Sequence, residues 1–127
     1  MIQKLLRWLR HRTLYVIADA RDNSITLSRA LARRMRVFDV EVPKVFVFRV
    51  DNDYAFTVNP HIEQPTQLAD IQYNSKHRCI GFESLTPTVN RIFYDYGLPA
   101  NSRCRLSVEP CTDTPGNLSF FKICRPQ

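Results

Sequence analysis

Residues 44–58, with the sequence KVFVFRVDNDYAFTV, predict a β-hairpin at the centre of the fold. The first strand, 44–50, carries Phe46, Phe48 and Val50 on one face and two further valines on the other. Apolar residues on both faces are typical of a strand buried in the middle of a sheet. The sequence DND that follows predicts a turn, and YAFTV predicts the returning strand.

A second hairpin is predicted at the end of the chain. Its strands are expected at 103–109 and 118–124, joined through a turn at 114–117 that contains Pro and Gly. If residues near 108 and 120 face one another, Cys104 lies opposite Cys124. We expect these two cysteines to be neighbouring reduced thiols rather than a disulfide.

The first hairpin is preceded by a segment that supports two interpretations. Residues 13–18 are β-branched and aromatic and predict a strand, followed by turn-forming residues. Asn23 or Ser24 can then cap a helix that runs to about Arg36. In the alternative interpretation, residues 25–27 form a strand that pairs with 13–18.

Two further helices are predicted. The clearer one begins near Thr86-Pro87 and ends at Gly97, with Pro99 beyond it. Its apolar stripe has helical spacing and comprises Val89, Ile92, Phe93 and Tyr96. The other is a short amphipathic helix within residues 1–12, whose stripe comprises Ile2, Leu5, Leu6 and Leu9.

These elements predict a single α+β domain. Two weaker strands near 68–73 and 78–82 complete an antiparallel sheet of about five to seven strands, with two or three helices packed on one side. A chain of 127 residues with 44% hydrophobic residues is long and apolar enough for one buried core. We distinguish a basic, helix-containing region, 1–36, from a near-neutral, strand-rich region with one helix, 37–127.

The net charge of +6 is concentrated in one part of the chain. Residues 1–36 carry nine cations and two acids, a local charge of +7, whereas residues 37–127 carry a charge of −1. Fourteen of the 18 cations are Arg, which binds phosphate and carboxylate groups in a bidentate manner. This asymmetry predicts an anionic partner, either nucleic acid or an acidic protein.

The leading functional hypothesis is a small non-enzymatic module that contacts nucleic-acid phosphates. In the helix predicted to end near Arg36, Arg29, Arg33 and Arg36 are spaced i, i+4 and i+7 along one face, with no acid at helical spacing to pair with them. The predicted phosphate contacts are Arg29, Arg33, Arg34 and Arg36, extended by Arg7, Arg10 and Arg12. The strand 44–50 resembles the strand on which ribonucleoprotein domains stack bases, but it lacks their glycines, and Phe46 and Phe48 are expected in the core.

A second hypothesis is a protein-interaction or subunit module. The N-terminal amphipathic helix would dock on a partner protein, or on a second copy of the chain, through Leu5, Leu6, Leu9 and Trp8. The same helix is also suited to packing on the core of its own chain or to lying on a membrane surface.

Catalytic motifs are missing from the sequence. Gly81, Gly97 and Gly116 are isolated, which excludes a Walker loop, a dinucleotide-binding fingerprint and a nucleophile elbow. We therefore expect no catalytic residues, no metal site and no cofactor. The third alternative is a small enzyme or small-molecule binder in which Cys79 lies near His61 or His77.

The sequence also bears on the compartment. No apolar run approaches the roughly 20 residues of a membrane span. Arg7 and Arg10 interrupt the first twelve residues, which therefore lack the apolar centre of a secretory signal, although they resemble a transit peptide. Four cysteines are too few for a disulfide-rich secreted scaffold. A cytoplasmic protein is the expectation.

Overall fold

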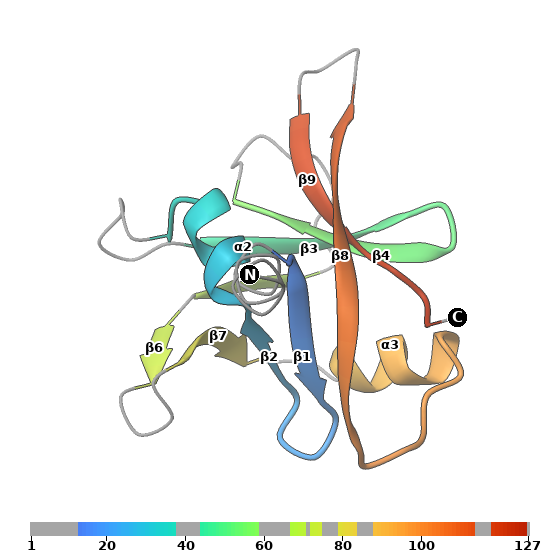
Figure 1. The fold of residues 1–127 in the computed structure, drawn as a ribbon. Coiled ribbons are helices and arrows are strands. Elements are labelled where there is room, and N and C mark those ends of the chain that lie inside the picture. The colour runs from blue at the N-terminus through green and yellow to red at the C-terminus, as the bar shows by residue number, and fades with distance from the viewer. Residues whose placement is uncertain are drawn as a thin grey trace, which may run out of the picture.

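The computed structural model describes residues 13–37, 44–58, 67–70, 72–74, 79–83, 88–113 and 118–126. These ranges contain nine β-strands and two α-helices (Figure 1). In chain order they are β1 (Tyr15–Asp19), β2 (Ser24–Leu27), α2 (Arg29–Arg34), β3 (Lys44–Val50), β4 (Asp53–Thr57), β5 (Gln67–Asp70), β6 (Gln72–Asn74), β7 (Cys79–Glu83), α3 (Thr88–Asp95), β8 (Arg103–Asp113) and β9 (Leu118–Ile123).

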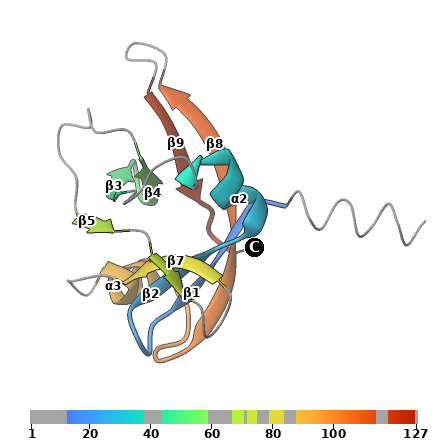
Figure 2. The ribbon, with the colours of Figure 1, turned by 90° about the vertical axis from the view of Figure 1, so that its left-hand side faces the viewer.

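The strands form one antiparallel sheet in the order β5-β3-β4-β9-β8-β1-β2-β7-β6. The sheet curls, so that β5 at one edge comes close to β7 near the other (Figure 2). The longest strand, β8, joins the two halves, because its first part pairs with β1 and its second part with β9. The chain is therefore a mostly-sheet α+β fold.

The sheet has more strands than predicted because it includes three very short ones. Six of the nine strands have five or more residues, which agrees with the predicted five to seven. The other three, β2, β5 and β6, have only three or four residues each and extend the sheet beyond the predicted number.

The β3–β4 hairpin has the predicted position at the interior of the sheet. Val50 pairs with Asp53, so Asp51 and Asn52 alone make the turn. Asp51 has a φ of 56°, a left-handed conformation that Asp tolerates better than most residues with a side chain. β5 and β9 flank this hairpin on either side.

The β8–β9 hairpin is present, but its predicted register is wrong. The Cys124 amide donates to the Ser107 carbonyl, so the strands are displaced by three residues from the alignment of Cys104 with Cys124. Cys104 instead pairs with Ala18 of β1. β8 runs on to Asp113, which pairs with Leu118, so the connection at 114–117 is where it was predicted, and only the alignment of the strands differs. Cys104, Cys111 and Cys124 are free thiols.

Residues 24–27 form a strand, so a helix beginning at Asn23 or Ser24 is wrong and the alternative interpretation is confirmed. β2 pairs with β1, with Ser24 opposite Asp19 and Leu27 opposite Val16. Its buried side chains, Ile25 and Leu27, alternate with half-buried polar ones, which is the period of a strand. Helix α2 begins only at Arg29 and ends at Arg34.

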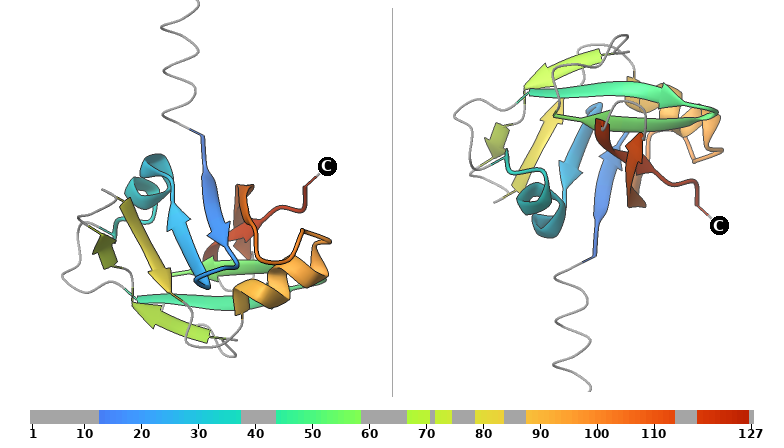
Figure 3. Two further views of the ribbon diagram at one scale, coloured as in Figure 1. Left: turned by 90° about the horizontal axis from the view of Figure 1, so that it is seen from below. Right: turned by 90° about the horizontal axis from the view of Figure 1, so that it is seen from above.

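The two helices contribute to one main core. α3 buries its predicted stripe, and α2 buries Leu31 and Ala32 against the inner face of the sheet. They lie near opposite ends of β1 (Figure 3): the residue before α2 bonds to Tyr15, and Asn23 in the β1–β2 turn accepts a hydrogen bond from the Val89 amide of α3 at 3.1 Å. Neither helix is long and apolar enough to span a membrane, in the part of the chain that was described.

A small second cluster lies on the opposite face of the sheet from the main core. Phe48, Ala55 and Phe120 are buried there, with the two phenyl rings in an edge-to-face contact at 5.4 Å between centroids. Phe48 is therefore buried as expected, although not in the main core, and Phe46 is half-buried. The phenyl ring of Phe48 is not available for stacking on a base.

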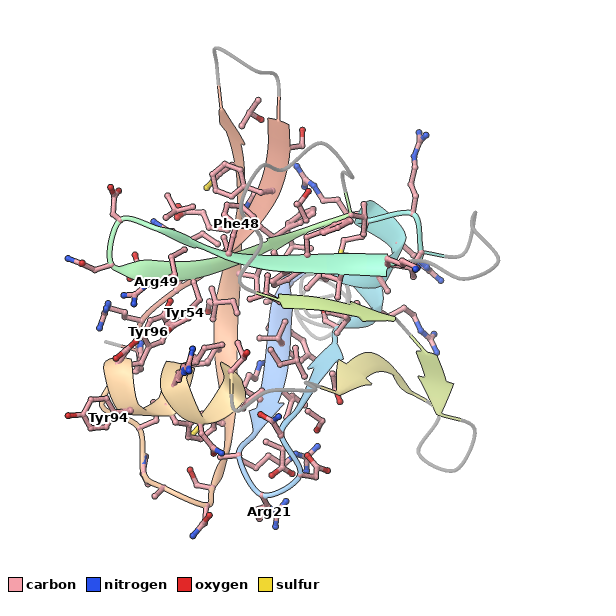
Figure 4. The ribbon with its side chains drawn as sticks, turned by 180° about the vertical axis from the view of Figure 1, so that it is seen from behind. Arg21, Phe48, Arg49, Tyr54, Tyr94 and Tyr96 are labelled. Atoms are coloured by element: carbon pink, nitrogen blue, oxygen red, sulfur yellow. The ribbon has the colours of Figure 1, made fainter. Side chains whose placement is uncertain are left out.

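The β1–β2 turn is held by a bidentate ion pair. Arg21 donates from Nε and Nη2 to the two carboxylate oxygens of Asp19 at 2.9 and 2.8 Å, and its backbone amide donates to the same carboxylate. The hydrogen bond from the Arg21 side chain is the main reason why the pKa of Asp19 falls from 3.8 to about 2. Arg21 itself reaches outward from this turn (Figure 4).

This ion pair predicts a specific pH dependence of stability. Because the folded-state pKa of Asp19 is depressed, its ionised carboxylate makes its full contribution to the free energy of unfolding above pH 4. That contribution is lost as the pH falls to about 2. The difference in free energy of unfolding between the wild type and Asp19→Asn should therefore shrink over that range in urea titrations. Arg21→Gln should remove the same pH dependence. A difference that stays constant from pH 5 to pH 2 would contradict the assignment.

Candidate nucleic-acid interface

Ser28 places helix α2 against the start of β1. Its Oγ caps the helix by accepting from the Leu31 amide at 3.2 Å. The same oxygen accepts from the Tyr15 amide at 3.3 Å and donates to the Thr13 carbonyl at 3.2 Å. The point at which residues 1–12 join the described fold, Thr13, is therefore held at the N-terminus of α2.

The four predicted arginines of this region are all exposed. Arg29, Arg33 and Arg34 lie on α2, and the last two lie in its final turn, where cations are favoured by the helix dipole. Arg36 follows the C-cap residue Met35 and has a φ of 57°. The expected row of three along one helical face is therefore wrong: Arg29 and Arg33 are one turn apart, but the chain leaves the helix before Arg36.

No carboxylate among the described residues pairs with any of these four arginines. Four cations elsewhere differ in this respect, whereas Arg91, Arg103 and Arg105 are also without a carboxylate partner among the described residues. Arg21 and Arg125 each contact an aspartate at 2.8 Å, Lys122 contacts Glu109 at 3.4 Å, and Arg49 contacts Asp95 at 3.8 Å. Within the described ranges, the positive charge around α2 has no carboxylate that neutralises it.

A further pair of residues lies beside α2 and was missed by the sequence reasoning. The guanidinium carbon of Arg105 on β8 lies 3.7 Å from the ring centroid of Tyr15 on β1. Arg105 is exposed and Tyr15 is half-buried. The two residues are ninety positions apart, and only the pairing of β1 with β8 brings them together. The alternation of Tyr15 and Ile17 with buried residues was the available signal that they face outward.

A polar network at the α3 end of the sheet is structural. The Tyr96 hydroxyl accepts from the Tyr54 amide at 2.9 Å and donates to the Ile123 carbonyl at 2.6 Å. Burial raises the pKa of Tyr96 to about 12. Burial, followed by the 2.6 Å hydrogen bond from its hydroxyl to Asp95, also raises the pKa of Tyr54. This network links β4, α3 and β9 (Figure 4).

Arg125 completes the network from the C-terminal side. Its Nε donates to Asp53 at 2.8 Å, and its two terminal nitrogens donate to the carbonyls of Asp95 and Asn52 at 2.7 and 2.6 Å. The guanidinium also lies over the Tyr96 ring, with 4.6 Å between its carbon and the centroid. Because all of these partners belong to the same chain, Arg125 fixes the C-terminal end of the chain against the β3–β4 turn and α3. The same contact occupies the carboxylate of Asp53 at the start of β4.

The remaining candidate residues are not placed. The helix predicted within residues 1–12, with its arginines and the partner-binding residues Trp8, Leu5, Leu6 and Leu9, lies outside the described ranges. So do His61 and His77, and the side chain of Cys79 is not described. Among the residues that are described, no group of three His, Cys, Asp or Glu side chains is suited to hold a metal ion.

No protein-family model matches this chain, and neither a curated protein nor a solved structure matches it. The function has to be inferred from the chemistry of its own surface.

Proposed function

We propose that this protein is a non-enzymatic module that binds the phosphate groups of nucleic acid through the basic region around α2. The observation that carries the proposal is that the four arginines at α2 are gathered at one place, are exposed and have no carboxylate partner among the described residues, whereas four cations elsewhere are ion-paired. Arg can hold a phosphate through two parallel hydrogen bonds, and neutralising phosphates releases condensed counterions.

The position of Thr13 supports a continuous basic surface. Ser28 anchors Thr13 beside α2, and Thr13 follows directly in the chain on the segment that carries Arg7, Arg10 and Arg12. The two basic stretches are separate in the sequence, and the residues that adjoin them, Thr13 and Ser28, are in contact. In this proposal both contact the backbone of one nucleic-acid ligand, and recognition of phosphate requires no base-specific motif.

The proposal is tested by the salt dependence of binding. Affinity for a nucleic acid, measured by fluorescence anisotropy from low to moderate salt, should fall linearly in a plot of log K against log salt. Arg29→Gln combined with Arg33→Gln should reduce the magnitude of that slope by about 2, since each lost phosphate contact removes about one unit.

The matched control removes the same charge from the other end of the fold. Arg49→Gln combined with Arg91→Gln changes two cations near α3, outside the proposed site, and should leave the slope almost unchanged. The fold should tolerate both substitutions, because surface ion pairs such as Arg49 with Asp95 contribute little to stability. Equal loss of affinity in both double variants would mean that only net charge matters and would refute the α2 site. Absence of binding at low salt would refute nucleic-acid binding altogether.

A further inference from the structure

The outer face of β1 and β8 carries a half-buried aromatic ring and exposed cations. Val16 and Leu106 point into the main core, so the residues that alternate with them face away from it. Tyr15 and Ile17 of β1 lie on this outer face, opposite Ser107 and Arg105 of β8. The two strands run side by side near the middle of the sheet (Figure 1).

Arg105 is positioned over the ring of Tyr15. At 3.7 Å from its carbon to the ring centroid, the guanidinium is in van der Waals contact with the aromatic face. Arg105 has no carboxylate partner among the residues described, and it is exposed. One face of the guanidinium is thus covered by Tyr15, and the side chain remains open to a ligand.

This pair lies next to the α2 arginines. Tyr15 bonds through its amide to Ser28, and Arg29 is the next residue in the chain. One strand spacing and one Cα–Cα step put the Cα atoms of Tyr15 and Arg29 within about 10 Å. The stacked pair and the α2 arginines therefore lie at the same end of β1, and in the inference below one strand of ligand passes over both.

We infer that the Tyr15–Arg105 pair is a stacking platform for an unpaired base, so that the ligand is single-stranded nucleic acid. This inference rests on the proposed phosphate-binding function and specifies its ligand. Bases of a duplex are stacked on one another and hidden from a flat sheet surface, whereas unpaired bases stack on aromatic rings and on guanidinium planes. The α2 arginines hold the backbone phosphates of the same strand.

The test compares two single strands that differ only in their bases. An oligothymidine and an abasic strand of the same length carry the same phosphates, so phosphate binding alone gives equal affinity for both. We expect the wild-type protein to bind the oligothymidine at least about fivefold more tightly, from the contribution of one stacked base. A blunt duplex of similar charge should bind more weakly than the oligothymidine at the same salt concentration.

Variants assign the preference to the platform. Tyr15→Leu removes the ring without changing charge and should abolish the preference for oligothymidine over the abasic strand, whereas Tyr15→Phe keeps the ring and should retain it. Arg105→Gln should reduce the preference more than Arg103→Gln, which removes one cation from the same strand and face. Thermal melts of each variant verify that the sheet is intact.

The outcomes separate the two proposals. Equal affinity of the wild type for both strands, with a salt slope that still depends on Arg29 and Arg33, would overturn the stacking platform and leave phosphate binding standing. A preference that persists in Tyr15→Leu would also overturn the platform. Failure to bind any of the three probes at low salt would overturn both.

Discussion

Tyr96→Phe is expected to lower the free energy of unfolding by about 2–3 kcal/mol, because it removes a single oxygen on which two buried backbone groups depend. The Tyr96 hydroxyl accepts from the Tyr54 amide and donates to the Ile123 carbonyl, and the residue is 6% exposed. Phenylalanine fills the same space but satisfies neither group. The measurement is chemical denaturation of the wild type and the variant under identical conditions.

Tyr94→Phe is the matched control for this substitution. Tyr94 lies two residues earlier, is 86% exposed, and points away from the fold at the end of α3 (Figure 4). The same chemical change should alter the free energy of unfolding there by less than about 0.5 kcal/mol. Similar effects of the two substitutions would contradict the role given to the Tyr96 hydroxyl.

The Tyr96 effect should also depend on pH. Burial raises the pKa of Tyr96 from 10.0 to about 12, so the folded state holds this proton more tightly than the unfolded state does. The protonated hydroxyl therefore makes its full contribution to the free energy of unfolding below pH 10, and this contribution is lost as the pH rises through 12. The difference in stability between the wild type and Tyr96→Phe should therefore narrow from pH 9 towards pH 12. A constant difference would indicate that the hydroxyl ionises freely in the folded protein.

Gly81→Ala is expected to destabilise the protein by about 2–3 kcal/mol, the cost of forcing an extra methyl group into a packed interior. A Cβ at Gly81 would lie 2.2 Å from the carbonyl oxygen of Ile25 and 3.0 Å from the Cα of Thr26. Both atoms belong to the backbone of β2, so neither can rotate away. Because Gly81 pairs with Thr26 on one side and Gln72 on the other, relief requires the sheet itself to move.

Gly97→Ala provides the comparison. No atom lies within 4 Å of a Cβ built at Gly97, but its φ is 68°, a conformation that costs a residue with a side chain about 1 kcal/mol. The same substitution should therefore be less harmful at the end of α3 than in β7. If Gly81→Ala unfolds at the same denaturant concentration as the wild type, β2 and β7 do not approach as closely as described.

Elements with strong local signals were predicted correctly. The β3–β4 hairpin is specified by a run of apolar residues, a polar turn and a returning strand, all within fifteen residues of sequence. The stripe of α3 follows the helical repeat, and the helix ends near Gly97, whose positive φ suits a glycine. In both cases the residues that decide the structure are neighbours in the chain.

Predictions that depended on distant partners were less successful. Ser24 to Leu27 satisfy both a helical stripe and a strand alternation, and pairing with β1 and β7 decides in favour of the strand. The predicted register of β8 with β9 was wrong by three residues, because Val108 pairs with Ile123 and the alternation of residues along one strand does not fix its alignment with a partner. The same sequence also does not show where the pairing of β8 with β1 ends and its pairing with β9 begins.

The candidate site likewise has features that follow from the sequence and features that depend on contacts between distant segments. The sequence by itself determined that the positive charge is concentrated before residue 37, because charge is a property of each residue. Only the tertiary structure decided which arginines have no carboxylate partner among the described residues, and which arginine lies over the Tyr15 ring. Tyr15 meets Arg105 and Thr13 meets Ser28 through strand pairing and capping between distant segments, and no local periodicity encodes those contacts.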